Sequence, residues 1–232
     1  MCQGNLYLFS GAFLMHNIHF IPKLNEYFPD HGICHLRYGL VPESSFPNSL
    51  IDALDTYHFL INHYKIDPQN IVLFADSAGG NVLLNLLVNL KQNALPNPRC
   101  VVMVSPWTDL QCKGDSWQRH KNIDFLDSDL QIELLLSLYS GFNLKKDHHV
   151  LEHPYFSPVN GDLKDLPPIL IQSAVYEAIY DDNMELFRKL KEAGNCVEHN
   201  VYESMTHAFQ CFPYSESKEA FMEITKFVCK SK

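Results

Sequence analysis

The segment "IVLFADSAGGNVLLNLL", residues 71–87, is the strongest constraint on what this chain can fold into. An apolar run typical of a buried strand ends at Ala75, and a pattern typical of a helix begins near Ala78. The chain must turn sharply between the two, and bulky side chains would collide in such a turn. Ala75, Ala78 and Gly79 are small enough to relieve that crowding. The segment therefore predicts a tight strand-turn-helix unit with Ser77 at its apex.

A serine at the apex of this turn has two interpretations. In the first, the strained turn raises the Ser77 hydroxyl above the sheet at the N-terminus of the helix. That is the nucleophile elbow, normally written G-x-S-x-G, with Ala75 in place of the first glycine. In the second, Ser77 is the N-cap of an ordinary turn, where serine is among the preferred residues. A base and an acid further along the chain are needed to choose between them.

The rest of the chain alternates short apolar runs with longer stretches of helical period. This is typical of a mainly parallel sheet with helices on both faces, which places the chain in the α/β class. We expect strands at 6–9, 33–38, 71–75, 100–105, 168–174 and 197–203, and helices at 44–64, 78–93, 181–194 and 217–230. Residues 110–158 break this rhythm and hold one expected helix, 128–142. We expect a single domain, 1–232, with residues 110–158 forming a lid insertion at the carboxyl edge of the sheet.

Composition and charge exclude several classes of protein. The chain has 232 residues, 46% of them hydrophobic, which is enough for one sizeable core. Its net charge is −9 and its 18 Lys and Arg residues are dispersed, so no nucleic-acid partner is expected. No apolar run reaches the roughly 18 to 20 residues of a membrane span, and the first residues lack the basic region of a secretion signal. A cytoplasmic location with reduced thiols is therefore expected, because the seven cysteines are odd in number and lack a C-x-x-C motif.

Two sites downstream of Ser77 supply the partners that a serine nucleophile needs. Such a serine requires a base within hydrogen-bond reach and an acid that orients the base. The segment "PPILIQSAVYEAIYDD" places Glu177 after an expected strand, and "VYESMTHAFQCF" places His207 in a loop after the last one. The chain order serine, acid, histidine is that of α/β-hydrolase triads. Asp181 and Asp182 follow closely and remain alternatives for the acid.

A family resemblance rests on six segments that occur in the same order as the family's motifs. They are "YGLVPESSFPNSLIDA", "ADSAGGN", "VSPWTDL", "YFSPVNGDLKDLPPILI", "YEAIYDD" and "THAF". With them the chain resembles the hormone-sensitive-lipase-like, or α/β-hydrolase fold-3, family of carboxylesterases along nearly its whole length. Because Glu177 stands at the family's catalytic aspartate, the fungal steryl acetyl hydrolases are the most similar branch. The resemblance implies Ser77 as nucleophile, His207 as base and Glu177 as orienting acid.

The stretch "FSGAF", residues 9–13, departs from the family's oxyanion loop, H-G-G-G-F. The resemblance implies that the backbone N–H groups of Gly11, Ala12 and Ala78 form the oxyanion hole. A change of side chain does not delete these donors, but it restricts backbone angles that glycine would allow. Loss of one donor typically lowers turnover about 100- to 1000-fold. The altered loop is therefore compatible with slow catalysis or with none.

The resemblance also implies that the chain is truncated at its N-terminus. Family members carry further residues before this loop, including two edge strands, and any membrane anchor would lie in that missing part. The strand "ICHLRY" is then expected at an uncovered sheet edge, which favours a homo-oligomer.

The expected activity is hydrolysis of small hydrophobic esters through an acyl-enzyme, with acetyl esters of sterols or other lipids as candidate substrates. Neither a metal nor a cofactor is expected, and we interpret His148, His149 and His153 as part of a solvated loop. The alternative is a non-catalytic relative that binds a small hydrophobic ligand. The presence of His207 favours the enzyme.

Overall fold

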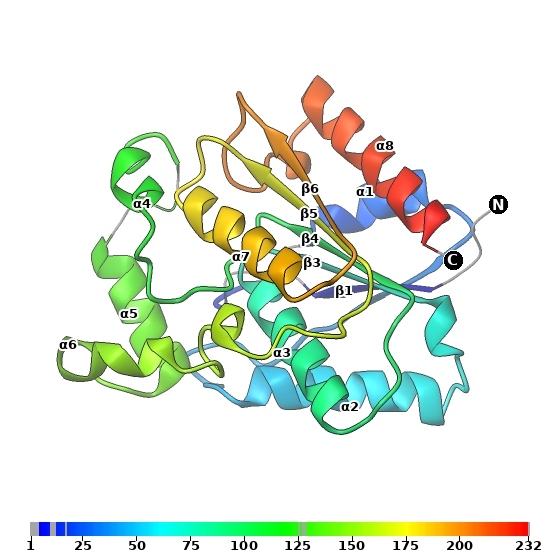
Figure 1. The fold of residues 1–232 in the computed structure, drawn as a ribbon, viewed down its shortest axis with the longest axis horizontal. Helices are drawn as coiled ribbons and strands as arrows, with labels where there is room; N and C mark the ends of the chain where they lie inside the picture. The colour runs from blue at the N-terminus through cyan, green and yellow to red at the C-terminus, as the bar shows by residue number, and fades with distance from the viewer. Residues whose placement is uncertain (1–4, 10–12, 17, 125, 127–128, 232) are drawn as a thin grey trace.

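Six parallel strands form one sheet at the centre of the molecule (Figure 1). The structure is a computed structural model and describes residues 5–9, 13–16, 18–124, 126 and 129–231. The strands are β1 (Asn5–Phe9), β2 (Gly32–His35), β3 (Ile71–Asp76), β4 (Cys100–Val104), β5 (Ile169–Ala174) and β6 (Val197–Tyr202). Their order in the sheet is β2-β1-β3-β4-β5-β6. The expected α/β class and parallel sheet are thus confirmed.

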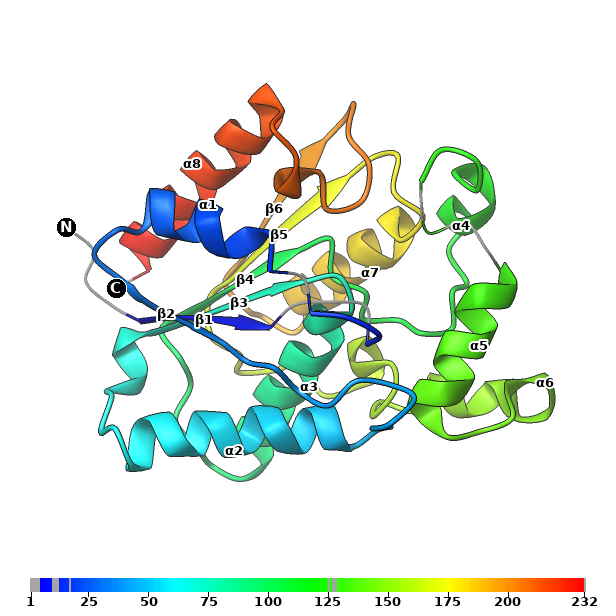
Figure 2. The same ribbon diagram turned by 180° about the vertical axis from the view of Figure 1, so that it is seen from behind.

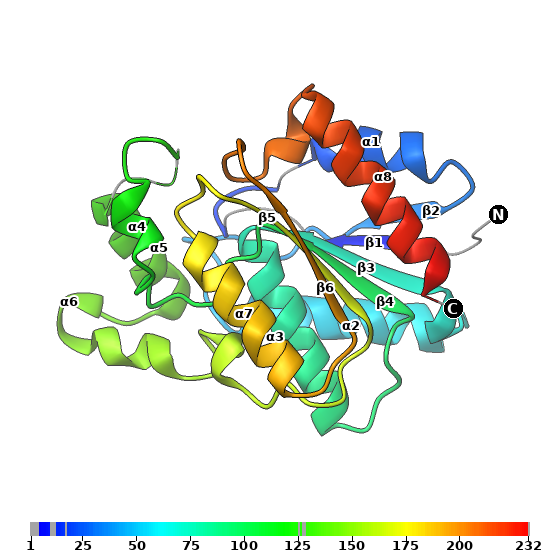
Figure 3. The same cartoon turned by 45° about the horizontal axis from the view of Figure 1, so that its top comes forward.

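Helices cover both faces of this sheet. The helices are α1 (Phe20–Tyr27), α2 (Asn48–Asn62), α3 (Ala78–Gln92), α4 (Ser116–Arg119), α5 (Asp129–Ser140), α6 (Leu144–Asp147), α7 (Tyr180–Glu192) and α8 (Ser215–Lys230). Figures 1 and 3 show α1 and α8 over one face, with α2, α3 and α7 over the other. Among the described residues, none of these helices combines the length and apolarity that crossing a membrane requires.

The alternation of side chains along β3 explains why its first five residues, 71–75, are all apolar. Ile71, Leu73 and Ala75 belong to the core shared with α2, α3 and α7. Val72 and Phe74 point the other way, into the core shared with α1 and α8. Successive residues of a strand face opposite sides, so a strand covered on both sides has to be apolar at every position. The central strand thereby holds its carboxyl end in a fixed place between two packed layers.

Most of the expected elements form where the sequence pattern puts them. All six strands are present, although β2 ends at His35, three residues earlier than expected. Helices α2, α3, α5, α7 and α8 lie within the expected segments or extend them by one or two residues. Helix α1 is not among the expected elements; it starts at Phe20 and buries Phe20 and Leu24 completely.

The chain between β4 and β5 contributes α4, α5 and α6, which lie beyond the carboxyl ends of the strands (Figure 2). Leu135 and Leu136 of α5 are part of the core that α2 and α3 share with the sheet. A lid role for residues 110–158 stays a prediction. The packing of α5 shows that part of this segment is joined to the body of the domain.

The cysteines depart from expectation at one position. Five described cysteines form no disulfide: Cys34, Cys100, Cys112, Cys196 and Cys211. Cys229 is disulfide-bonded. The expectation of reduced thiols is therefore wrong at Cys229.

The first turn of α3 is packed directly under the loop that follows β4. A Cβ atom on Gly80 would lie 2.5 Å from Cβ and 2.9 Å from Cα of Pro106. Real Cβ atoms do not approach so closely, so this crossing requires glycine. The sequence pattern assigned the relief of crowding to Gly79, whereas the close contact that the structure describes is at Gly80.

Substitution of Gly80 tests this crossing. We expect Gly80→Ala to lower the free energy of unfolding by about 1 to 3 kcal/mol, because the added methyl group displaces Pro106. Gly141→Ala is the control: its Cβ would meet nothing within 4 Å, but its φ of +76° gives a backbone penalty of about 1 to 2 kcal/mol. Urea unfolding measures both. A Gly80→Ala protein as stable as wild type would contradict the contact.

Candidate active site

Ser77 occupies the turn between β3 and α3 in a strained backbone conformation. Its φ is 52° and its ψ is −127°, a region that residues other than glycine rarely adopt. Its N–H donates to the carbonyl of Val104 at 3.0 Å, and its carbonyl accepts from the N–H groups of Gly80 and Trp107, both at 2.9 Å. Strain of this kind persists only where the surroundings hold it in place, and it is concentrated at functional sites.

The three residues that the sequence predicted as a triad lie together in the structure. Ser77 Oγ is 2.9 Å from His207 Nε2, and His207 Nδ1 is 3.2 Å from Glu177 Oε2. The side chains come from three different loops, after β3, β5 and β6, and all of them are buried. With the imidazole proton on Nδ1, the neutral ring donates to Glu177 and accepts from the Ser77 hydroxyl. This is the arrangement in which a histidine can take the serine proton.

The Glu177 carboxylate is fixed on both of its oxygens. Oε1 accepts from the N–H of Ala174 and from the side-chain amide of Asn183, each at 3.0 Å, while Oε2 faces His207. The Glu177 carbonyl lies 3.1 Å from His120 Nδ1. Asn183 is a functional residue that the sequence reasoning missed. Its signal was its place six residues after Glu177, on the buried face of α7.

The two alternative acids face away from the histidine. Asp181 Oδ2 accepts from the N–H of Ser116 at 2.8 Å, and Asp182 Oδ2 accepts from Trp117 Nε1 at 2.9 Å. Ser116 and Trp117 both belong to α4. These carboxylates therefore join α4 to the loop that carries Glu177.

The pKa of the His207 imidazole is raised above its ordinary value of 6.5. Burial alone lowers this pKa, because it penalises the charged ring. The hydrogen bond and charge of Glu177, together with the charges of Asp124 and Asp76, outweigh burial. A raised pKa makes the neutral ring a stronger acceptor for the serine proton.

Asp182 is a second group with an altered pKa, and here burial acts in the opposite direction. The side chain is buried, which raises the pKa of its carboxyl to about 7, from 3.8. The hydrogen bond from Trp117 lowers it, while the nearby charges of Asp109, Asp181 and Glu177 raise it further. Asp182 therefore holds a proton over much of the acidic range, where an exposed aspartate is ionised.

A cavity of about 240 Å³ lies among α4, α5 and α6. Its walls include the apolar side chains of Trp117, Ile132, Leu136 and Leu144. The centroid of the Trp117 ring lies 5.7 Å from that of the Trp107 ring. The backbone N–H of Trp107 donates to the Ser77 carbonyl, while its indole N–H donates to the Asp109 carbonyl. One pair of indole rings thus connects the cavity wall to the turn that carries Ser77.

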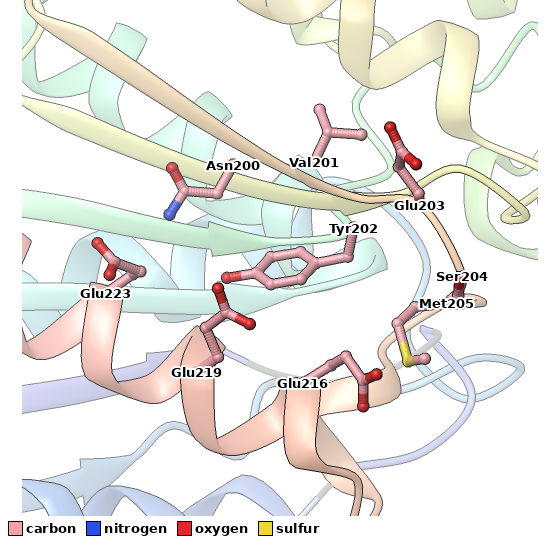
Figure 4. Close-up of a pocket in the computed structure, with 9 residues that line it drawn as sticks. All are labelled: Asn200, Val201, Tyr202, Glu203, Ser204, Met205, Glu216, Glu219 and Glu223. Atoms are coloured by element: carbon pink, nitrogen blue, oxygen red, sulfur yellow. The ribbon is translucent and has the colours of Figure 1, made fainter.

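A larger cavity, of about 430 Å³, lies between β6 and α8 (Figure 4). It is lined by Tyr202 and by a row of glutamates on α8, Glu216, Glu219 and Glu223. Figure 4 shows the Glu219 carboxylate beside the Tyr202 hydroxyl, with Glu223 on the side of Asn200 and Glu216 on the side of Met205. It shares no lining residue with the Ser77 site.

The predicted absence of a metal site concerns His148, His149 and His153. Among the described residues, no group of three or more His, Cys, Asp or Glu side chains has the geometry to hold a metal ion. His148 and His149 lie in a short 3₁₀ turn that ends at Glu152, and His153 Nδ1 accepts from the N–H of Tyr155.

Two of the three predicted oxyanion donors, Gly11 and Ala12, lie outside the described residues. The third, Ala78, is the first residue of α3 and follows Ser77 directly. The start of the loop is fixed by pairing, because Phe9 at the end of β1 is in register with Ala75 of β3.

The chain matches a family model for the alpha/beta hydrolase fold over residues 6–211. The chain belongs to this α/β-hydrolase family. The solved structure of an esterase from the bacterial hormone-sensitive lipase family is similar to it, with a TM-score of 0.87 and 30% identity over 99% of this chain and 76% of that one. The resemblance to the hormone-sensitive-lipase-like family of carboxylesterases is thereby confirmed, whereas the steryl acetyl hydrolase branch and the N-terminal truncation stay predictions.

Curated relatives of this α/β hydrolase are named as hydrolases of esters. An acetyl-hydrolase from Streptomyces hygroscopicus is 31% identical over 76% of this chain and 57% of that protein. An ethyl acetate hydrolase from Pseudomonas putida is 30% identical over 74% of this chain and 54% of that protein. The chain therefore spans less than two thirds of the length of each of these two relatives.

This α/β hydrolase differs from its family's motifs beside the histidine as well as at the oxyanion loop. Ala208 stands where the family's H-G-F has glycine, and it adopts the left-handed conformation with φ 49°. Its N–H donates to Ser105 Oγ at 3.1 Å, and Ser105 is itself at φ 44°. Two strained residues thus support the loop of His207, where the family uses glycine for one of them.

The raised pKa of Asp182 predicts how stability depends on pH. Between 3.8 and about 7 the folded protein holds a proton that the unfolded chain has lost, so stability falls as pH rises through that window. We expect Asp182→Asn, which keeps an oxygen for the Trp117 N–H, to be more stable than wild type at pH 8 by about 1 to 3 kcal/mol. The difference should shrink toward pH 4.

Urea unfolding at the two pH values measures this effect. Asp181→Asn is the matched control, because its carboxylate is partly exposed, and it should show no comparable gain at pH 8. If Asp182→Asn proves less stable than wild type at pH 8, the charged form is favoured in the fold and the expectation is wrong.

Proposed function

We propose that this α/β hydrolase is a serine carboxylesterase that hydrolyses small hydrophobic esters. The observation that carries the proposal is the buried relay from Ser77 Oγ through His207 to Glu177. The strained turn at Ser77 and the esterase relatives support it. The alternative, a non-catalytic binding protein, has no such support, because every side chain of the relay is present.

The proposed reaction proceeds through an acyl-enzyme. Ser77 Oγ attacks the ester carbonyl carbon while its proton passes to His207 Nε2, and Glu177 stabilises the resulting imidazolium. His207 then gives this proton to the leaving alcohol, which departs as the acyl-enzyme forms. Water attacks the acyl carbon, again with His207 as base, and the acid is released as Ser77 regains its proton.

The oxyanion that forms in both steps is proposed to accept from the N–H groups of Gly11, Ala12 and Ala78. The Ala78 N–H belongs to the first turn of α3, where backbone donors have no acceptor within the helix and the helix dipole favours negative charge. Ser10 and Ala12 stand at glycine positions of the family's loop, which restricts that backbone. We therefore propose slow rather than fast turnover.

The substrate is proposed to be a small hydrophobic ester with a short acyl group. The names of the two relatives, an acetyl-hydrolase and an ethyl acetate hydrolase, support an acetyl ester. The apolar cavity beside Trp117 supports a hydrophobic part on the substrate. An acetylated sterol or another lipid alcohol is the specific form of this proposal, and no metal or cofactor takes part in it.

The proposal also includes a cytoplasmic location and a homo-oligomer. The five described cysteines that form no disulfide support a cytoplasmic location, whereas the disulfide at Cys229 does not. Cell fractionation tests the location. The proposed homo-oligomer uses the edge strand β2, and sedimentation measurements test it.

Removal of the nucleophile tests the activity. We expect wild type to hydrolyse 4-nitrophenyl acetate and butyrate, and Ser77→Ala to lose about 1000-fold or more of that rate, because the variant lacks the hydroxyl that lies 2.9 Å from His207 Nε2. Ser215→Ala is the matched control, since Ser215 is exposed at the start of α8. Equal rates for wild type and Ser77→Ala would rule out the assignment.

The pH profile tests the roles of Glu177 and His207. Only the neutral imidazole accepts the serine proton, so kcat/KM should rise with pH through a pKa above 6.5. Glu177→Gln removes the charge that raises this pKa, so the rise should move to lower pH while the plateau falls about 100- to 10,000-fold. Asp181→Asn should leave the position of the rise unchanged. A shift with Asp181→Asn and none with Glu177→Gln would exchange their roles.

A further inference from the structure

Helix α4 and the turn after it pack against the loop that carries Glu177. Ser116 Oγ donates to the carbonyl of Ala178 at 2.6 Å. His120 Nδ1 lies 3.1 Å from the carbonyl oxygen of Glu177, and Asp124 Oδ2 accepts from the N–H of Ala178 at 2.7 Å. The side chains of Ser116, His120 and Asp124 are all buried. Buried polar contacts of this kind fix the groups that make them.

The peptide bond between Glu177 and Ala178 is held at both of its polar atoms. Its carbonyl oxygen can only accept, so His120 Nδ1 carries a proton and donates to it. Its N–H donates to Asp124. The N–H of Asp124 is itself bonded to the His120 carbonyl at 3.0 Å, so the two side chains lie one helical turn apart. A single turn of chain therefore holds this peptide from both ends.

This hold acts on the backbone that aims the Glu177 carboxylate. Glu177 lies in the loop between β5, which ends at Ala174, and α7, which begins at Tyr180. The side chain of Glu177 leaves the Cα atom that adjoins the held peptide, and its Oε2 is 3.2 Å from His207 Nδ1. A rotation of that peptide would turn the carboxylate away from the imidazole.

Asp124 also acts on His207 through its charge. Burial lowers the pKa of the His207 ring, but the hydrogen bond and charge of Glu177 and the charges of Asp124 and Asp76 raise it above 6.5. These carboxyl groups come from three places: the loop after β5, the turn after α4 and the end of β3. A negative charge in a buried site favours a cation that forms beside it.

We propose that His120 and Asp124 are positioning residues for the catalytic triad. They hold the peptide between Glu177 and Ala178, so that the Glu177 carboxylate stays aimed at His207. The Asp124 charge also favours the imidazolium that forms when Ser77 gives up its proton. This inference rests on the proposed function, because it assigns roles in the same reaction.

Asp124→Asn separates the charge from the hydrogen bond. Its amide oxygen still accepts from the Ala178 N–H, so kcat at high pH should stay within about threefold of wild type. The rise of kcat/KM with pH should move to lower pH, because a charge that raises the pKa of His207 is gone. Asp115→Asn is the matched control: it makes the same change of charge at an exposed residue before α4, and the rise should stay in place.

Asp124→Ala and His120→Ala remove the two contacts themselves. Each should lower kcat for 4-nitrophenyl butyrate about 10- to 100-fold with KM within about threefold, because a misaimed acid weakens the transition state more than substrate binding. His120→Asn supplies an amide N–H close to the position of Nδ1, so kcat should recover to within about threefold of wild type. Its rise with pH should not move, because Asp124 is still charged in that variant.

A double variant tests whether Asp124 acts on kcat through Glu177. In the Glu177→Gln background, Asp124→Ala should lower kcat less than about threefold, since the group that it positions is already lost. Losses that multiply would overturn the inference, and so would wild-type kcat in Asp124→Ala and His120→Ala. An unmoved rise in Asp124→Asn would remove the role of the charge. If Asp124→Asn lowers kcat as far as Glu177→Gln does, Asp124 is the triad acid and the assignment is wrong.

Failure of the proposed function gives a different result. In that case wild type shows no Ser77-dependent hydrolysis, and two measurements test the inference without catalysis. An NMR titration of the His207 ring, identified by the signal that His207→Gln lacks, should have its midpoint at lower pH in Asp124→Asn but not in Asp115→Asn. The amide hydrogen of Ala178 should exchange faster in Asp124→Ala. An unchanged midpoint or unchanged exchange would overturn the corresponding role of Asp124.

Discussion

The site depends on the crossing of the loop after β4 over the first turn of α3. Gly80 allows Pro106 to approach within a distance that no side chain would tolerate, and this brings Trp107 next to Ser77. The N–H of Trp107 then satisfies the Ser77 carbonyl and helps to hold the strained turn. The same loop carries the indole that packs on Trp117. A single backbone contact therefore sets both the conformation of the serine and the wall of the neighbouring cavity.

After β5, the carboxyl groups of Glu177 and Asp182 differ in their hydrogen-bond partners. Glu177 receives bonds from Ala174, Asn183 and His207, which fix its carboxyl group beside the histidine. Asp182 receives one bond, from Trp117, and burial raises the pKa of its carboxyl to about 7. Two carboxyl groups five residues apart thus have different partners: Glu177 is bonded to His207, and Asp182 is bonded to Trp117 of α4.

Local pattern was sufficient to predict the strands, the turn at Ser77 and the chain order of the relay, because strand period and tight turns are properties of short segments. The same reasoning missed contacts between segments that are distant in the chain. The need for glycine at position 80 comes from Pro106, and the role of Asn183 comes from the inward face of a helix that also carries many charges. The burial of α1 against α8 likewise depends on how the layers pack.

The stack of Phe13 on Tyr139 limits how α5 can serve as a lid. If α5 swung away from the sheet, it would take the Tyr139 ring from Phe13 and break the bond from Phe46 to the Tyr139 carbonyl. These two contacts fasten the last turn of α5 to the body of the domain. A lid movement within residues 110–158 is therefore expected in parts of this segment other than the last turn of α5.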